Sequence, residues 1–460
     1  MHRNIKLLFF TWATFFSLIS ISLASNAGIL MLRWSFPVNI DSTIAPHPLD
    51  IVGQLVYFGS SVKTGYTNYL YALNISSGLE IWRYNTSIPI NYVTHFRNNN
   101  TDYIVAGTSG STTQPSKSHV IARDTSKNET HWKSTNLSYT ITSLTSAKSY
   151  LTTGEDVVVG LDTGIGTGTV VRLRGDNGSV VWSYPTTGSV FTVSELKDGS
   201  IIVGTREIFP PTGRVYCLNA NGTLKWGPFF QDKPLTLLKK FDDFNGDNIP
   251  EVIAVFNDYI SSNGLIHVLN GTNGAEISPT WPYNNYGDLI KDLLCTVDYT
   301  GDGFPDIVMG TEDGNITIVN GRTASRFKGP TSVGYTVSYI QYMYYYENGV
   351  AYLNKTLAVS VQEYIPPSSF PYFIRGINMS NLSIMKEYSV PSRAENLLNT
   401  SNYTQPYVGD LIFTASNTVY NISGDEIIVP EYSSPIILLI LLVTAWLLTT
   451  RLRRERPRVH

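Results

Sequence analysis

The chain contains little cysteine and little charge. Two Cys in 460 residues exclude a small scaffold cross-linked by disulfides and metal sites built from several cysteines. Charged residues make up only 15%, against roughly 25% in an average soluble domain, whereas apolar residues reach 42%. This composition excludes a disordered chain and a coiled coil. A net charge of −3 provides no basic footprint, so no nucleic-acid partner is expected.

Motifs for catalysis are also missing. The seven His residues show no zinc-binding spacing, and the sequence has no nucleophile elbow, P-loop or dinucleotide fingerprint. Cys217 and Cys295 fall in distant parts of the repeat described below, so two free thiols are expected. These absences favour a non-enzymatic protein. A pair of carboxylates that the fold draws together would not show in the sequence, so a hydrolase or lyase remains an alternative.

The two ends of the chain predict where it is located. Residues 1–27 have a basic start and an apolar run ending in small residues, which is typical of a secretory signal peptide. This run is also long enough for an uncleaved anchor. Residues 431–450 contain nineteen consecutive uncharged residues and predict one transmembrane helix. The tail at 451–460 carries five Arg and one Glu, which indicates the cytoplasmic side. Residues 28–430 are therefore expected outside the cell, tethered to the cell membrane.

Sequons support this location. The sequence has fifteen Asn-x-Ser/Thr sites, and none lies in the terminal apolar runs. Without its first six and last ten residues, the chain has 26 basic and 35 acidic residues, a net charge of −9. We therefore predict a glycoprotein with a mildly acidic ectodomain. The predicted glycosylation sites are Asn74, Asn128, Asn177, Asn221, Asn270, Asn378 and Asn421.

A repeat organises the region between the two ends. Each unit has a short apolar strand such as DVVVG, followed by an alternating strand, a Gly/Asn turn and another strand ending near Trp, as in VVRLRGDNGSVVW. A period of about 40–50 residues with about four strands per unit predicts an all-β fold, a β-propeller. The repeated Trp are interpreted as packing residues between blades. They are Trp34, Trp82, Trp132, Trp182, Trp226 and Trp281.

The count of repeats leaves a choice between eight blades and seven. Seven complete units are visible, together with a single strand at 30–38 and a fragment at 411–429. If these leftovers pair, the ring closes as an eighth blade without free sheet edges, so eight is favoured and seven is the alternative. The tandem GxxxxW units resemble the PQQ-like (quinoprotein-type) propeller repeat over about residues 30–429. Quinoprotein dehydrogenases of this fold often have a vicinal Cys pair or a haem motif. This chain has neither, so neither PQQ nor haem is expected.

Two loops have the spacing of calcium ligands. Oxygen donors recur at positions 1, 3, 5 and 9, with a backbone carbonyl expected at position 7. The loops resemble the calcium loops of FG-GAP repeats in integrin α-chain propellers, which implies structural Ca²⁺. Thr300 departs from the Asp or Asn usual in that family, and a plain hairpin is the alternative for each loop. The predicted ligands are Asp243, Asn245, Asp247, Ile249 and Glu251 in one loop and Asp298, Thr300, Asp302, Phe304 and Asp306 in the other.

The loops between the second and third strands of each blade carry no sequons. Aromatic and Arg side chains on such loops favour an interface. The predicted binding face comprises Tyr66, Arg206, Phe209, Tyr259, Tyr364 and Phe370. The leading hypothesis is a membrane-anchored extracellular propeller that binds a protein or glycan, as an adhesion, receptor-like or envelope scaffold. The alternatives are a cell-surface hydrolase or lyase with carboxylates in the propeller funnel, and a structural component of a surface layer.

Overall fold

The computed structural model of the chain describes residues 31–38, 47–60, 68–86, 88–108, 118–164, 166–207, 209–295, 297–347, 350–363, 371–399, 410–415 and 418–423. All of them belong to one compact unit, and their regular elements are β-strands. They include no helix long and apolar enough to cross a membrane. The predicted signal segment 1–27, membrane span 431–450 and tail 451–460 lie outside the described residues.

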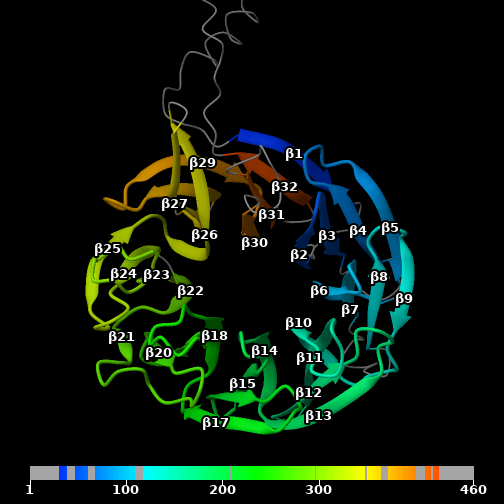
Figure 1. Ribbon diagram of the computed structural model, residues 1–460. Helices are drawn as coiled ribbons and strands as arrows, with labels where there is room; N and C mark the ends of the chain where they lie inside the picture. Colours follow the sequence, from blue (N-terminus) through cyan, green and yellow to red (C-terminus); the bar gives the residue numbers. More distant parts are fainter. Residues whose placement is uncertain are drawn as a thin grey trace, which may run out of the picture. The chain divides into compact units, whose positions relative to one another are not determined.

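The strands form eight four-stranded antiparallel sheets, arranged as the blades of a propeller (Figure 1). We call the strands of a blade A to D from the axis outward. Blades 1 and 2 are β2 (His47–Val52), β3 (Leu55–Gly59), β4 (Asn68–Asn74), β5 (Glu80–Thr86) and β6 (Ile90–Asn98), β7 (Thr101–Thr108), β8 (His119–Asp124), β9 (Glu129–Lys133). Blades 3 and 4 are β10 (Thr140–Lys148), β11 (Glu155–Gly164), β12 (Thr167–Leu173), β13 (Val180–Thr187) and β14 (Ser189–Glu195), β15 (Ile201–Glu207), β16 (Thr212–Leu218), β17 (Leu224–Gln231).

The second half of the ring repeats this plan. Blades 5 and 6 are β18 (Leu235–Lys240), β19 (Val252–Asp258), β20 (Asn263–Leu269), β21 (Tyr283–Asn285) and β22 (Ile290–Cys295), β23 (Ile307–Thr311), β24 (Asn315–Val319), β25 (Arg326–Ser332). Blade 7 is β26 (Thr336–Glu347), β27 (Val350–Gln362), β28 (Tyr372–Asn378) and β29 (Ile384–Val390). Blade 8 is β30 (Ala394–Asn399), β31 (Asp410–Ala415), β32 (Thr418–Ser423) and β1 (Met31–Pro37).

The prediction of eight blades closed by the two leftover segments is confirmed. Strand β1 pairs antiparallel with β32, from Met31 opposite Ser423 to Pro37 opposite Thr418 (Figure 1). The first described strand thus supplies the outer strand of the last blade, and the backbone hydrogen bonds of β32 are satisfied on both sides. Because β1 begins where β32 ends, the described chain enters and leaves the ring on the same face.

The two faces of the ring carry different loops. The B–C loops within blades and the D–A connections between blades lie on one face, which we call the B–C face. The A–B and C–D turns lie on the other, which we call the A–B face. Antiparallel sheets with this strand order fix the assignment, because each strand ends on the face opposite to the one where it begins. Met31 and Ser423 both lie at the A–B face.

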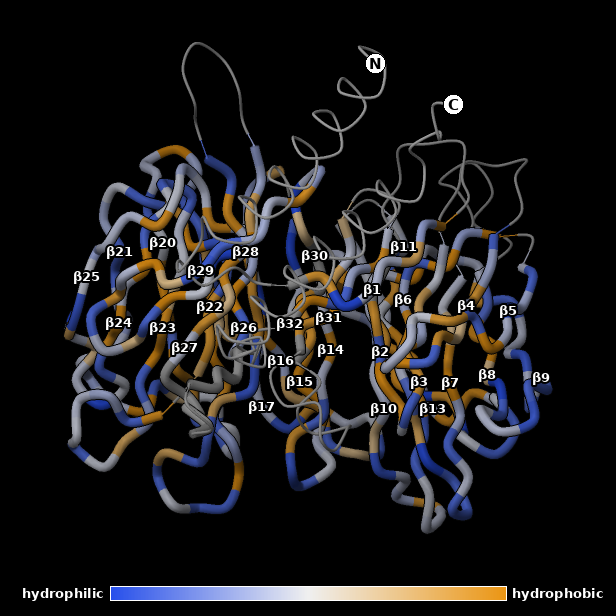
Figure 2. The backbone as a smooth tube through the Cα atoms, turned by 90° about the horizontal axis from the view of Figure 1, so that it is seen from above, coloured by the Kyte–Doolittle hydropathy of each residue, from blue (hydrophilic) through white to orange (hydrophobic). Residues whose placement is uncertain are grey.

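The hydrophobic core is divided among the blade interfaces. The buried side chains form eight clusters, and each cluster joins two neighbouring blades, including blade 8 with blade 1. Apolar residues follow the strands, whereas the loops on both faces are largely hydrophilic (Figure 2). The sheets therefore pack face to face around the axis, so stability depends on an unbroken ring.

The interpretation of the repeated Trp as packing residues is confirmed at four interfaces. The indole N–H of Trp132 donates to the carbonyl of Gly175 in the next blade at 2.8 Å, and the C–D turn glycine Gly178 packs on the ring. Equivalent hydrogen bonds join Trp34 to Ile75, Trp182 to Ala220 and Trp226 to Gly271, each at 2.9 Å. Each Trp therefore ties the outer strand of one blade to the C–D turn of the next.

Candidate functional site at the mouth of the propeller

A β-bulge interrupts the inner strand of blades 1 to 7 near its start, on the B–C face. In blades 3 and 4 the extra residues are Thr142 and Phe191, and each follows a buried aliphatic residue, Ile141 or Val190. A bulge re-aims the side chains of a strand, which otherwise alternate strictly between its two faces. The extra residues of blades 3 to 7 line the two pockets at the mouth of the ring; they are Thr142, Phe191, Thr236, Lys291 and Ser338.

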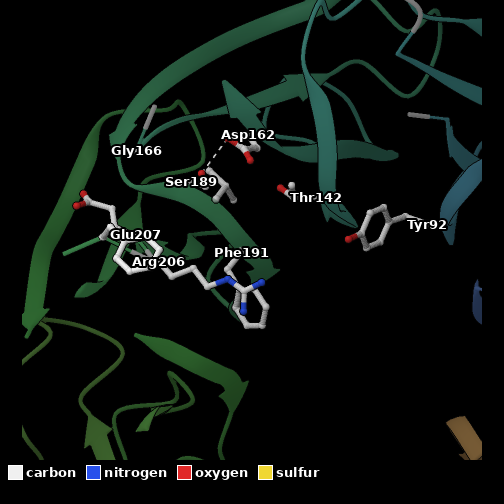
Figure 3. A pocket seen from close by; sticks show the side chains of 10 residues that line it. Tyr92, Thr142, Asp162, Gly166, Ser189, Phe191, Arg206 and Glu207 are labelled. Atoms are coloured by element: carbon white, nitrogen blue, oxygen red, sulfur yellow. Dashed lines mark hydrogen bonds between the residues drawn. The ribbon is translucent and has the colours of Figure 1, made fainter. Parts of the chain in front are cut away.

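The first pocket lies at this mouth, between blades 2, 3 and 4, and has a volume of about 590 Å³ (Figure 3). Its walls are the starts of the inner strands and the ends of β11 and β15. A volume of this size lies in the ordinary range for a ligand site. The lining residues are Tyr92, Thr142, Asp162, Gly166, Ser189, Val190, Phe191, Arg206, Glu207 and Phe209.

Both carboxylates of this pocket have partners within the chain. Asp162 accepts hydrogen bonds from the Ser189 hydroxyl and the Gly164 N–H, both at 2.8 Å (Figure 3). Glu207 accepts from the guanidinium of Arg214 at 2.8 Å. In each acid, one carboxylate oxygen is thus held by neighbouring groups of the chain.

The cation and two hydroxyls of the same pocket remain available. The exposed Arg206 guanidinium lies 4.2 Å over the Phe191 ring and makes no ion pair or hydrogen bond with the described residues. The hydroxyl of Thr142 is buried without a hydrogen-bond partner among them. Burial raises the pKa of the Tyr92 phenol, against the opposing effect of Arg206, so this group stays a neutral donor. The pocket therefore contains a cation and two hydroxyl groups for which the described residues provide no hydrogen-bond partner.

A second pocket of about 520 Å³ lies on the same face along blades 4 to 7 and the connection to blade 8, and shares Phe191 with the first. Its charged groups are largely paired. Lys291 and Glu312 form an ion pair at 2.8 Å, and Asp292 binds Lys239 at 2.5 Å. It is lined by Phe191, Thr236, Leu237, Lys291, Asp292, Glu312, Thr336, Val337, Ser338, Tyr339, Gln362, Tyr372 and Arg393. Together the two pockets form a polar mouth with Phe191 at the junction.

Exposed apolar side chains lie on the loops of blades 4 and 5 on the same face. Phe209 is 91% exposed on the B–C loop of blade 4, Ile260 is 94% exposed on that of blade 5, and Tyr286 is 78% exposed on the following D–A connection. Tyr259 stands beside Ile260 and is 59% exposed. Large apolar groups held out from a rigid scaffold are typical of an interaction surface.

The structure describes three of the six residues of the predicted binding face. Arg206, Phe209 and Tyr259 lie on the B–C face, and the first two line the first pocket. Tyr66, Tyr364 and Phe370 lie outside the described residues. The sequence did not reveal the pocket residues Tyr92, Thr142 and Phe191. No local signal marks them, because a bulge in an inner strand changes which side chains face the axis.

The two predicted calcium loops are the A–B turns of blades 5 and 6, and they share one hydrogen-bonding plan. Asp243 accepts backbone N–H bonds from Gly246 and Asn248, both at 2.8 Å. Asp298 does the same for Gly301 and Gly303, at 2.6 and 2.7 Å. The ninth residues, Glu251 and Asp306, are fully buried and hold the loop starts through the N–H groups of Phe244, Tyr299 and Thr300.

The donor chemistry of these loops fits Ca²⁺, because carboxylate, amide and hydroxyl oxygens are hard ligands. Burial raises the pKa of Glu251 to about 7, and repulsion by Asp243 and Asp247 adds to this effect, despite the backbone hydrogen bond that the carboxylate accepts. A bound cation would offset the negative charge of these three acids. In the described part of the chain, no three His, Cys, Asp or Glu side chains form a group that could hold a metal ion. Calcium binding would therefore require side chains to turn away from the backbone N–H groups.

The predicted glycosylation sites fall on the A–B face with one exception. Asn177 and Asn221 are exposed in C–D turns, and Asn74, Asn128, Asn270 and Asn378 are half-buried at the same turns. Asn421 instead lies inside β32, is only 1% exposed, and donates to the carbonyl of Ile75 in blade 1 at 3.3 Å. The prediction of a glycan at Asn421 is wrong, because the folded ring leaves no space around its amide nitrogen.

The prediction of two free thiols is confirmed. Burial raises the pKa of Cys217 to about 11 and that of Cys295 to about 12. Both groups are therefore protonated at neutral pH and are poor nucleophiles.

Comparisons with known proteins agree on the propeller. Structural neighbours include Chaetomium thermophilum Sqt1 bound to the N-terminus of ribosomal protein L10, with 15% identity over 85% of this chain and 98% of that chain, and a TM-score of 0.60. The computationally designed Ika8 protein has 12% identity, coverage of 85% and 100%, and a TM-score of 0.57. The Dos1 propeller has 11% identity, coverage of 86% and 96%, and a TM-score of 0.54. At such identities the likeness shows the fold alone.

None of the curated proteins matches the sequence. A family match does exist, and it covers residues 34–277, more than half of the chain, including five of the six repeated Trp. The eight-bladed ring described above is consistent with that match. The chain belongs to the family of PQQ-like β-propeller repeats described as outer membrane protein assembly factor BamB.

Proposed function

We propose that this propeller is a non-enzymatic scaffold that binds a partner protein at the mouth of its B–C face. The observation that carries the proposal is that two pockets meet at Phe191 there, within a rim of exposed apolar loop tips. Both carboxylates of the first pocket are already paired, which favours binding over catalysis. The described chain enters and leaves the ring on the opposite face.

We further propose that the ring is displayed outside the cell by the segments that the sequence predicts. A signal at 1–27 directs export, residues 431–450 span the membrane, and 451–460 form a cytoplasmic tail. Exposed sequons at the C–D turns, such as Asn177 and Asn221, support an extracellular location, because such sites are acceptors for N-glycosylation in secreted chains. Protease treatment of intact cells should remove the ring while an epitope after 460 stays protected. Protection of both would contradict this topology.

A photo-crosslinking residue tests the proposed binding face. It is placed at Tyr259 on the B–C face, and in a matched variant at Tyr150, which is 43% exposed in the A–B turn of blade 3. Irradiation of cells carrying the full chain should give a discrete crosslinked protein from position 259 and none from position 150. Equal crosslinking from both positions, or none from position 259, would contradict a partner at the B–C face.

We also propose that the loops at 243–251 and 298–306 bind Ca²⁺ as a structural ion. Calcium should then raise the melting temperature, since a ligand present at 100 times its Kd stabilises the folded state by about 2.7 kcal/mol. Asp247→Ala and Asp302→Ala should lower the melting temperature in calcium and reduce its calcium dependence. Asp176→Ala, which removes an exposed acid from a C–D turn, serves as the control. An unchanged melting temperature of the parent protein after chelation would show that these loops are plain turns.

A further inference from the structure

We infer that the first pocket recognises a carboxylate, and that the carboxylate is an acidic side chain of the partner protein with apolar residues beside it. This inference rests on the proposed function, because it names the chemistry of the segment that occupies the B–C mouth. Four features support it: the unpaired charge, the two free hydroxyls, the size of the pocket and the apolar rim.

The pocket presents an arginine that has no ion pair. Glu207 is paired with Arg214, whereas Asp162 Oδ1 accepts hydrogen bonds from the neutral Ser189 and Gly164 groups. Arg206 has no counter-ion among the described residues. Its guanidinium is held by stacking on Phe191, so little side-chain entropy remains to be lost when an anion binds. An arginine presented in this way forms short, charge-assisted hydrogen bonds with a carboxylate.

Two hydroxyls complete the donor set. The buried Thr142 hydroxyl has no partner in the described structure, which is costly in a folded protein unless a ligand supplies one. The Tyr92 hydroxyl points into the same space as Thr142 and the Arg206 guanidinium (Figure 3). Each of these side chains comes from a different blade, so the site exists only in the closed ring. A carboxylate that binds the Arg206 guanidinium would enter the space that the Tyr92 hydroxyl faces.

The surroundings favour a peptide over an acidic sugar. Sugar rings stack on open aromatic faces; within the pocket Arg206 covers Phe191, and Phe209 is the exposed ring of the lining. The most exposed apolar groups on the loops of blades 4 and 5 are Phe209 and the aliphatic Ile260, and an aliphatic side chain suits the apolar residues of a peptide. The pocket volume of about 590 Å³ accommodates a short segment rather than a single ion.

The test uses the full chain in detergent and an array of acetylated, amidated pentapeptides. Each has a central Glu flanked by Leu, Ile, Val, Phe or Tyr, and each is matched by a peptide with Gln at the centre. We expect the Glu member of the best pairs to bind at least about tenfold more tightly than the Gln member, as one charge-assisted contact predicts. Arg206→Gln should remove this preference. Arg174→Gln, on the A–B face, should keep it.

Thr142→Val separates recognition from folding. Valine has the same shape as threonine but removes the buried hydroxyl, so the melting temperature should stay equal or rise by a degree or two. Binding of the Glu peptides should nevertheless weaken by about threefold, because one donor is lost. A variant that is more stable and yet binds less well cannot be explained by a purely structural role of Thr142.

Several results would overturn the inference. They are equal binding of Glu and Gln peptides, an unaltered preference in Arg206→Gln, or tighter binding of free glucuronate than of any peptide, which would identify a sugar site. If the crosslink from position 259 persists while the array shows no acidic preference, the carboxylate inference is wrong and the proposed function stands. If the crosslink is also absent, the proposed function fails as well.

Discussion

Replacing Asp156 with Ala should lower the free energy of unfolding by about 3–5 kcal/mol, because it leaves a buried cation without its counter-ion. Arg172 is fully buried, Asp156 is 3% exposed, and their side chains form an ion pair at 2.8 Å. The guanidinium also donates to the carbonyl of Ala220 in the next blade at 3.1 Å and to that of Lys148. Loss of Asp156 therefore weakens both the blade and its contact with the next one.

The measurement is equilibrium unfolding in denaturant, with two comparison variants. Asp176→Ala removes the partner of Arg174 from an exposed pair in the adjacent turn, where solvent screens the interaction, and should change stability little. The double variant Arg172→Met with Asp156→Leu should recover most of the lost stability, since a buried pair can often be replaced by apolar side chains. If Asp156→Ala is no more harmful than Asp176→Ala, the pair does not hold the two blades together.

The sequence predicted the fold well because the signals of a propeller are local and repeated. The Trp spacing indicated the blades. The indole hydrogen bonds to Gly175 and Gly271 give the physical reason for that spacing, because each Trp contacts the C–D turn of the next blade. The glycine that ends the predicted short strand also has a physical reason. A Cβ at Gly160 would lie 2.5 Å from Val190 Cγ1 of the following blade, so a larger residue would push the blades apart.

The sequence predicted the candidate site only in part. Arg206, Phe209 and Tyr259 were found because loop residues stay on the face where their loop emerges. Thr142 and Phe191 were missed because each is the extra residue of a bulge, and a strict alternation would assign them to the wrong side of the strand. The Arg172–Asp156 pair was also invisible, since the two residues come from paired strands and no local pattern marks them.

The second large effect on stability is expected at the contact that closes the ring, where the C–D turn of blade 1 packs on Trp34 of blade 8. Gly78→Ala tests this contact. Gly78 has φ +68°, and an added Cβ would lie 2.6 Å from the Trp34 ring of blade 8. The substitution therefore adds a steric clash to the cost of a left-handed backbone. Trp34→Ala, which removes an indole that is 8% exposed and hydrogen-bonded to Ile75, should cost about 3–5 kcal/mol.

Gly53→Ala in the same blade is the matched control, because Gly53 has φ +57° and no atom within 4 Å of the added Cβ. It carries the backbone cost alone, so Gly78→Ala should be less stable than Gly53→Ala by about 1–3 kcal/mol, the usual penalty for overpacking. In Trp34→Ala, which has no ring at that position, Gly78→Ala should cost no more than Gly53→Ala. A penalty that persists without the indole would mean that the turn of blade 1, rather than its contact with β1, limits the stability of the ring.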